Sequence, residues 1–471
     1  MGGLSKKAFQ LAAIAGEDEA KPHFALDAGN LLFKQGGLVP GREGQGKLTA
    51  TAIVKAYNAM GYDAVAVGGL DLQAGVPFLQ SLAKEAKFAW LSANLVSQST
   101  KKAIMRPGVT LQARGIKVWV VGLTGAAILP ANEDAMILPW DQVLPGLLDK
   151  EAKTHDLVVL LSSLPAPDNQ RIAETYRNIH LVIQAGVAAN VISAQPINNT
   201  VLASAGPQGK QLGVLEIDWQ PSKRWASQAR ENLASTREAL AQVQFQLSAI
   251  RQDPDPETAL RNRPEQLNAY HLLQKRETAL VADVERLSKE VAEEDRGRDR
   301  PSTYRNRFVA MEATLPDQPQ VLSLITRLKE EVNAMGQQQG VASPPAPGRQ
   351  IYLGSAGCGS CHQSQHAAWQ ATPHASAYQA LAKDRQQFNP ECLPCHVTGI
   401  AMDQGKEALS LPEDRRGVGC ESCHGPVRDH RERRQGKDMI RKPSPEMCLT
   451  CHVPPHDLDF EYGAAIKKVG H

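Results

Sequence analysis

Four copies of one five-residue motif, C-x-x-C-H, constrain this chain more than any other feature of its 471 residues. All eight cysteines belong to these motifs, and the first of them is Cys358. Each cysteine pair is followed directly by a histidine: Cys358 and Cys361 by His362, Cys392 and Cys395 by His396, Cys420 and Cys423 by His424, and Cys448 and Cys451 by His452. No cysteine is left over outside the motifs.

The motif is the attachment signature of a c-type haem. Two thiols three residues apart lie on one side of a helical turn and can form thioethers with one haem, while the adjacent histidine reaches the iron. Zinc sites also use C-x-x-C pairs, but they need no histidine directly after every pair. Redox-active C-x-x-C sites accompany βαβ patterns, which are missing here. Four complete motifs therefore predict four covalent haem c groups.

All four motifs lie in residues 351–471, a stretch of 121 residues. A domain of this size cannot bury four haems inside a conventional hydrophobic core. We therefore expect a mostly α-helical or irregular domain in which the haems are the core and pack close to one another, as electron transfer requires.

The second axial ligand of each iron must come from outside the motifs. Five further histidines are present in this region for four irons: His366, His374, His430, His456 and His471. Methionine is the alternative ligand, and it raises the reduction potential; the candidates are Met402, Met439 and Met447. The abundance of histidine favours bis-histidine ligation, which leaves at least one of the five histidines as a bystander.

The first 219 residues alternate between short apolar runs and helical stretches, which indicates an α/β domain with a covered sheet. The predicted strands are His23–Ala28, Ala64–Val67, Phe88–Ser92, Val118–Leu123, Leu157–Leu161, Leu181–Gln184 and Leu212–Trp219. Helices are expected at Thr49–Met60 and Val76–Glu85. The formal net charge is only +2, which argues against a nucleic-acid binder. No apolar run approaches the ~20 residues that span a bilayer.

Residues 220–336 change to a heptad pattern. Leucines recur every seven residues in two segments, at Leu233, Leu240 and Leu247 and at Leu273, Leu280 and Leu287. The intervening Asp253–Pro256 breaks the helix, so the two segments predict an antiparallel helical hairpin, and a third helix is expected near Gln320–Met335. The hairpin is interpreted as a spacer, arm or dimerisation element. Residues 337–350 have the composition of a linker.

The cysteine region resembles the tetrahaem cytochrome c family first known from nitrifying bacteria, over residues 352–471. The resemblance rests on the four motifs and on the residues around them: Trp369, Thr372–Ala375, Val397–Gly399, Gly417–Pro426, His430, Phe460 and His471. It implies that His374, His430 and His471 are distal ligands. The second haem of the family is five-coordinate, and His366 or His456 is the candidate that could close this position here.

The amino-terminal region resembles the 5'-nucleotidase branch of the metallophosphoesterases. The matching stretches are Met1–Ala8, His23–Phe33, Tyr57–Leu70, Leu91–Leu95 and Asn199–Gly213. The resemblance implies two metals held by carboxylates, histidines and an asparagine. Here Asn30 stands at the bridging aspartate, Gly68–Asp71 replaces the Gly-Asn-His-Glu motif, Leu161–Ser163 lacks a histidine, and Ala185–Ala188 replaces Gly-His-x-His. The remaining candidates, His23, Asp27, Asp71 and His155, do not rebuild the site, so a catalytically dead, degenerate domain is expected.

Together these features predict an exported tetrahaem c-type cytochrome that carries electrons, with the phosphoesterase-like domain as a scaffold or docking module. Haem c attachment implies a periplasmic, outer-surface or extracellular location, and Lys6–Gly16 is interpreted as a helix within the domain, although it superficially mimics a signal peptide. The expected partners are redox proteins or an extracellular electron acceptor, with self-association through the hairpin or the haems. One alternative is a haem enzyme that converts a small nitrogen compound at a five-coordinate iron. The other is a metal-dependent nucleotidase with a haem accessory domain.

Overall fold

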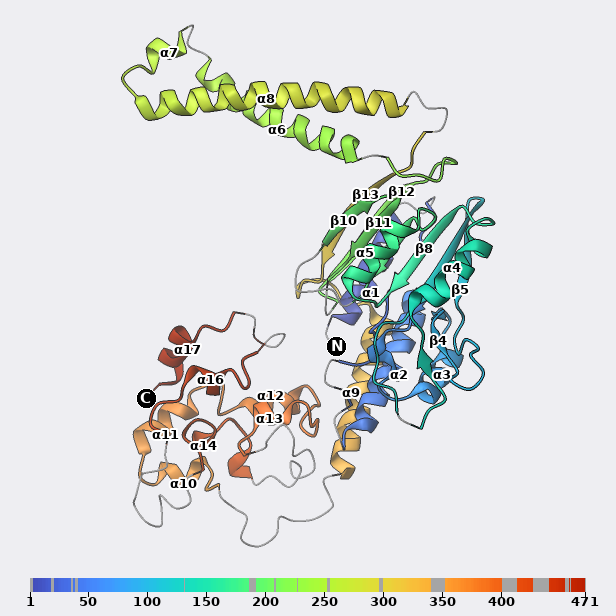
Figure 1. Cartoon of the computed structure of the whole chain (residues 1–471). Helices are drawn as coiled ribbons and strands as arrows, with labels where there is room; N and C mark the ends of the chain where they lie inside the picture. The colour runs from blue at the N-terminus through green and yellow to red at the C-terminus, as the bar shows by residue number, and fades with distance from the viewer. Residues whose placement is uncertain are drawn as a thin grey trace. The chain divides into compact units, whose positions relative to one another are not determined.

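The computed structural model describes residues 3–17, 21–34, 37–38, 41–130, 132–185, 192–206, 209–226, 228–251, 255–295, 300–339, 352–399, 413–426, 440–453, 457 and 459–470. By their internal contacts, the residues form two compact units. One unit comprises Gln10–Leu31 and Gly61–Leu315 and holds the sheets and the helical hairpin. The other comprises Met1–Phe9, Leu32–Met60 and Pro316–His471 and holds the cysteine motifs (Figure 1).

The sheet-bearing unit is built on two sheets of largely parallel strands. The smaller has the order β1-β2-β3, formed by Leu26–Asp27, Ala64–Ala66 and Ala89–Leu91. The larger has the order β10-β11-β9-β8-β6-β5, formed by Ile192–Ile197, Thr200–Ser204, Leu181–Gln184, Leu157–Ser162, Ile116–Leu123 and Gly108–Ala113. The edge strands β5 and β10 pair antiparallel with their neighbours, and the inner pairs are parallel. The predicted α/β class is confirmed.

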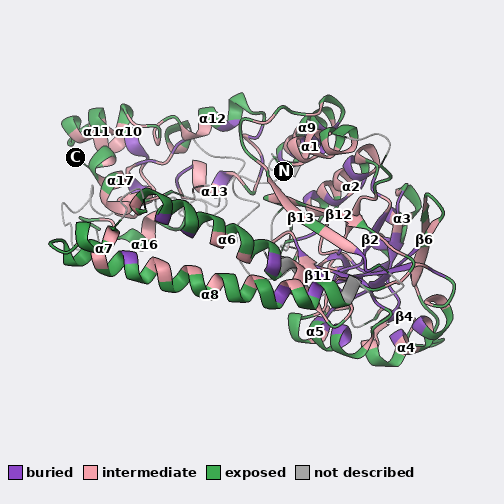
Figure 2. Cartoon of the chain, turned by 90° about the horizontal axis from the view of Figure 1, so that it is seen from above, coloured by how far each residue is buried: buried purple, intermediate pink, exposed green. Residues whose placement is uncertain are grey.

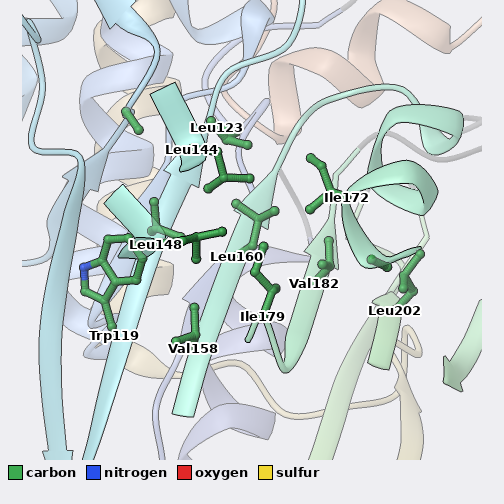
Figure 3. Packing of buried hydrophobic residues seen from close by; sticks show 13 residues of the cluster. Trp119, Leu123, Leu144, Leu148, Val158, Leu160, Ile172, Ile179, Val182 and Leu202 are labelled. Atoms are coloured by element: carbon green, nitrogen blue, oxygen red, sulfur yellow. The ribbon is translucent and has the colours of Figure 1, made fainter. Parts of the chain in front are cut away.

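The core forms where helices cover the larger sheet. All six residues of β8 are buried, because this strand is central and packs on both faces. On one face, Val158 and Leu160 of β8 meet Leu144 and Leu148 of α4 (Trp140–Glu151), and Ile172 of α5 (Ala166–Thr175) packs into the same cluster (Figure 3). The remaining helix of this region, α3, spans Val76–Glu85, the range that its sequence predicts.

A strand that the sequence analysis missed, β13, follows the hairpin. β13 (Thr303–Ala310) pairs antiparallel with β12 (Gln211–Asp218) along the whole length of both strands. The sequence of β13 shows no clear alternation of polar and apolar residues, because charged residues such as Arg305 and Arg307 lie within it. The hairpin is consequently an insertion between two paired strands.

The hairpin itself is confirmed. Helix α6 (Gln228–Ile250) packs along α8 (Pro264–Asp295) with opposite direction, since Leu233 at the start of α6 meets Val291 at the end of α8. At the other end, Leu247 packs on Tyr270, and Arg251 pairs with Glu277 at 2.5 Å. Burial is confined to the seam between the helices, as the green outer faces in Figure 2 show. No helix among the described residues is both long and apolar enough to cross a membrane.

Three helices, two from the first sixty residues and one central, pack together in the motif-bearing unit. Ala56 of α2 (Glu43–Met60) packs on Val321 and Ile325 of α9 (Pro319–Gln339), together with Ala8 of α1 (Leu4–Glu17). The start of α9 is fixed by Asp317, which accepts a hydrogen bond from Ser5 and pairs with Lys6 at 3.5 Å. The helix predicted at Lys6–Gly16 is present as α1, and α9 runs to Gln339, into the first residues of the predicted linker.

Acid will destabilise the sheet-bearing unit through His180. Its side chain is 5% exposed, its Nδ1 accepts the N–H of Val158 at 2.9 Å, and burial lowers its pKa from 6.5 to about 4. Between pH 6.5 and pH 4, His180 is protonated in the unfolded chain but stays neutral in the folded chain. The free energy of unfolding therefore falls as the pH is lowered through this range, by roughly 3 kcal/mol at pH 4. Urea unfolding followed by tryptophan fluorescence measures this loss. His180→Asn should flatten this part of the pH profile; a profile with the same slope in the variant contradicts the assignment.

Candidate haem-attachment site

Each C-x-x-C-H motif lies on one helical turn. The turns are α10 (Ser355–Gly359) with the residues after it, α13 (Leu393–His396), α14 (Cys420–His424) and α16 (Pro445–Cys448) with the residues after it. In the first and fourth motifs the histidine N–H donates to the carbonyl of the first cysteine at 2.9 Å, for His362 and His452. A turn of this kind brings both thiols and the imidazole to one side, as a thioether-linked haem needs.

Three of the four motif histidines are held in one tautomer. Nδ1 of His396 donates to the carbonyl of Ala377 at 2.8 Å, and Nδ1 of His424 donates to the carbonyl of Ile440 at 2.7 Å. Nδ1 of His452 donates to Oδ2 of Asp457 at 2.7 Å. Each bond fixes the proton on Nδ1 and leaves the lone pair on Nε2, the arrangement found at metal-ligating histidines. The residues present therefore fit an iron bound through Nε2.

The motifs lie in two pairs. The side chains of Cys358 and Cys420 interact with each other, which lowers the pKa of Cys420 to about 6 and raises that of Cys358. In the same way, the side chains of Cys395 and Cys451 interact with each other, which lowers the pKa of Cys451 to about 6. The first motif is thus adjacent to the third, and the second is adjacent to the fourth.

A buried carboxylate ties the first pair together. Glu421 lies inside the third motif, is 4% exposed, and accepts the N–H groups of Leu353 and Gly354 at 2.9 and 2.7 Å. These two residues lead directly into α10, the turn of the first motif. Ser355, also buried, accepts the N–H of Cys420 at 3.2 Å. The first and third motifs therefore share one hydrogen-bonded framework.

Of the distal candidates, His374 has the clearest geometry. Its ring centroid lies 6.1 Å from that of His452, with the planes at 61°. Two imidazoles whose nitrogens each lie about 2 Å from a shared metal have ring centres roughly 6 Å apart. Burial, followed by the nearby His452, lowers the pKa of His374, which favours the neutral form that ligates. The ring of His452 stacks on the ring of Phe460, with the two ring centroids 4.5 Å apart.

Of the other four histidine candidates for the distal position, only His366 lies among the described residues. His366 lies on α11 (Gln363–Gln370), where its ring centroid is 5.4 Å from that of Trp369. His430, His456 and His471 lie outside the described residues, as do Met402 and Met439. The described part of this region has a small buried hydrophobic cluster, formed by Leu381, Leu393 and Val397.

The sequence analysis missed three residues of this site. Asp457, the acceptor for His452, lies five residues after it, and its acidic side chain was the available signal. Glu421 lies in a variable position of its own motif. Asn389 accepts the N–H groups of Cys392 and Leu393 on its carbonyl at 3.0 and 3.1 Å and so begins the second attachment turn.

At the positions where the phosphoesterase resemblance implies metal ligands, the polar side chains of Asn30 and Asp71 accept backbone N–H groups. Asp71 is fully buried, and its Oδ2 accepts the N–H groups of Asn30 and Gly68 at 2.9 and 2.8 Å. The Oδ1 of Asn30 accepts the N–H of Leu70 at 3.0 Å. A Cβ at Gly68 would lie 2.2 Å from Oδ1 of Asn30, so the two loops are in direct contact. These loops are closed by hydrogen bonds where the resemblance implies ligands to two metals.

The remaining candidates do not add a metal site. Both ring nitrogens of His155 are satisfied, since Nδ1 donates to the carbonyl of Glu151 and the hydroxyl of Thr110 pairs with Nε2. Oδ1 of Asp27 accepts the N–H of Gly29, and His23 is exposed. Gly186–Ala188 lies outside the described residues. Within the described ranges, no three His, Cys, Asp or Glu side chains are grouped to hold a metal ion.

Comparison with known proteins separates the chain into two parts. The family model described as cytochrome c554 and c-prime matches residues 357–425. Cytochrome c-554 of Nitrosomonas europaea is 33% identical over 129 residues, covering 20% of this chain and 55% of that protein. The C-terminal part thus resembles the cytochrome c554 family, and the resemblance expected from the sequence is confirmed.

The amino-terminal region resembles 5'-nucleotidases. Protein UshA of Yersinia enterocolitica is 31% identical over 108 residues, covering 23% of this chain and 20% of that protein. The 5'-nucleotidase of Vibrio parahaemolyticus is 29% identical over 152 residues, covering 32% of this chain and 26% of that protein. The chain therefore spans about half or less of the length of the relatives it matches.

Among solved structures, the sulfate thiohydrolase SoxB of Thermus thermophilus aligns with a TM-score of 0.40 at 19% identity, covering 46% of this chain and 40% of that one. A 5'-nucleotidase precursor from the same organism aligns with a TM-score of 0.39 at 18% identity, covering 47% of each chain.

Proposed function

We propose that this protein is an exported c-type cytochrome that transfers electrons through four covalently bound haems. The observation that carries the proposal is the set of four C-x-x-C-H turns, three of which hold Nδ1 of the histidine on an acceptor and leave Nε2 for iron. When bound, each haem supplies an iron that cycles between Fe(III) and Fe(II).

The residues of the chain set the conditions for that cycle. Bonding of Nδ1 to a carbonyl or carboxylate raises the basicity of Nε2, which stabilises the ferric state and lowers the reduction potential. Asp457 should have the strongest effect on the reduction potential, because it is a carboxylate and its Oδ2 lies 2.7 Å from Nδ1 of His452. A second imidazole, from His374 in the case of His452, lowers the potential further than a methionine ligand would.

The pairing of the motifs supports transfer between haems within one chain. Contact between the cysteines of motifs one and three, and between those of motifs two and four, brings the attachment points of each pair together. The pKa of the Cys423 thiol, in motif three, is raised first by burial and then by an electrostatic interaction with Cys448, in motif four. Adjacent attachment points favour a continuous electron path over four independent centres.

For the amino-terminal domain we propose a scaffold or docking role without phosphoester hydrolysis. Addition of Mn²⁺, Co²⁺ or Zn²⁺ to the full chain should give no hydrolysis of 5'-nucleotides above the metal blank, because Asn30 and Asp71 are bonded to backbone N–H groups of the facing loop. A phosphate-release assay measures this. Metal-dependent turnover that survives repurification contradicts the proposal and restores the nucleotidase hypothesis.

Export follows from the chemistry of attachment, which takes place outside the bacterial cytoplasm. We propose a periplasmic or outer-surface location, with redox proteins or an extracellular acceptor as partners, and self-association through the hairpin or the haem region.

Electron paramagnetic resonance of the oxidised protein, with haem quantified in parallel, separates this proposal from the haem-enzyme hypothesis. Four low-spin irons per chain leave no open position and support the carrier. A high-spin signal from about one quarter of the iron would mean an open coordination position and would favour an enzyme acting on a small nitrogen compound.

A further inference from the structure

We propose that Gln45 of α2 and Asn333 of α9 are positioning residues for the second haem-attachment turn, α13. The inference rests on the proposed function, because α13 matters only if Cys392 and Cys395 carry a haem. It assigns a role to two helices that lie outside the motif region 351–471 and within the same compact unit.

The link between α2 and α13 passes through Asn389. Asn389 is 8% exposed. Its Oδ1 accepts two hydrogen bonds of 2.9 Å, one from the N–H of Glu391 and one from Nε2 of Gln45. Its carbonyl accepts the N–H groups of Cys392 and Leu393, which begin α13. Gln45 therefore bonds to the residue that fixes the start of the turn carrying His396.

The chain of amides continues to α9. Nδ2 of Asn389 donates to Oε1 of Gln386 at 2.7 Å, and Oδ1 of Asn333 accepts the N–H of Phe388 at 2.8 Å. A Cβ at Gly336 would lie 2.0 Å from the carbonyl oxygen of Phe388, so the segment lies directly on the helix backbone. The contact is thus both close and directional.

The chemistry of these groups explains why they position the turn and do more than add stability. Gln45 is 6% exposed and Gln386 is 7% exposed, so their amides cannot exchange the bonds for water. Nε2 of Gln45 donates to Asn389, and Nδ2 of Asn389 donates to Gln386, which fixes one arrangement of the three side chains. The surrounding pairs, Lys329 with Asp384 and Arg385 with Glu330, are largely exposed and contribute little.

Displacement of α13 should alter one haem only. The imidazole of His396 is oriented by α13 and by the carbonyl of Ala377, and the potential of a haem follows its axial ligand. Gln45→Leu removes the donor to Asn389, so the reduced-to-oxidised ratio of the second haem at a fixed potential should change at least about threefold, equivalent to about 28 mV for one electron.

The test is a spectroelectrochemical titration of the full haem-loaded chain. The wave of the second haem is identified as the one that is missing from the double variant Cys392→Ala/Cys395→Ala. Gln45→Leu should shift that wave and leave the other three in place, while the matched Gln338→Leu, on an exposed glutamine of α9, should shift none. Asn333→Ala should shift the same wave, and Asn333→Asp, which keeps an acceptor for Phe388, should restore it.

The possible outcomes distinguish a failure of the proposed function from a failure of the positioning role. A parent protein without four haem waves would overturn the proposed function itself. A parent with four waves, none of which moves in Gln45→Leu or Asn333→Ala, would overturn the positioning role alone. Equal shifts of all four waves would show a general structural effect and would also overturn it.

Discussion

Replacement of His374 by alanine is expected to convert one haem iron per chain from low spin to high spin. The 6.1 Å between the ring centroids of His374 and His452 is the separation of two imidazoles on one metal. Nδ1 of His452 is engaged by Asp457, so its Nε2 is the atom available to iron. Loss of the second imidazole leaves that iron with one protein ligand.

Electron paramagnetic resonance of the oxidised variant, compared with the parent, measures the change. His23→Ala provides the matched control, because His23 is an exposed histidine of the other unit. The control should leave the spectrum unchanged. If His374→Ala and the parent have the same low-spin content, then His374 does not ligate iron.

The second large effect concerns Glu421. Glu421→Leu should lower the free energy of unfolding of the haem region by roughly 2–6 kcal/mol, since it leaves one buried and one partly buried N–H group without an acceptor at about 1–3 kcal/mol each. Those groups belong to Leu353 and Gly354, at the entrance to the first attachment turn. Leucine is close in volume, so the cost comes from the lost acceptor.

Glu461 offers a matched control. It also accepts two backbone N–H groups, those of Gly463 and Ala464 at 2.8 and 2.6 Å, but it is exposed at the start of α17 (Tyr462–Val469). Water can replace this cap, so Glu461→Leu should cost only about 1 kcal/mol. Chemical unfolding followed at the haem Soret band compares the two. Losses of the same size would contradict the role given to burial of Glu421.

The sequence was sufficient to predict the elements whose pattern is strong. The runs that became β8 and β9 are continuous apolar stretches, because parallel strands are buried on both faces. The leucine heptads of α6 and α8 predicted the hairpin because both helices bury a single seam. β13 was missed because its polar residues alternate with apolar ones only weakly and its partner, β12, lies more than eighty residues earlier.

The site was predictable in its attachment groups and less so in what holds them. A C-x-x-C-H motif is local and can be read directly, whereas the acceptors for Nδ1 of His396 and His424 are backbone carbonyls, which carry no sequence signal. The same holds for Gln45 and Asn389, which are 344 residues apart in the chain. Such contacts depend on the tertiary fold and become visible only in the structure.

The central claim is that four covalent haems on one chain exchange electrons. Coulometric reduction of the purified full chain, with its intact mass determined in parallel, tests this most directly. The account predicts a mass increase of four haems and uptake of four electrons per chain, reversible on reoxidation. A chain that carries fewer haems, or that takes up fewer than four electrons, would contradict it.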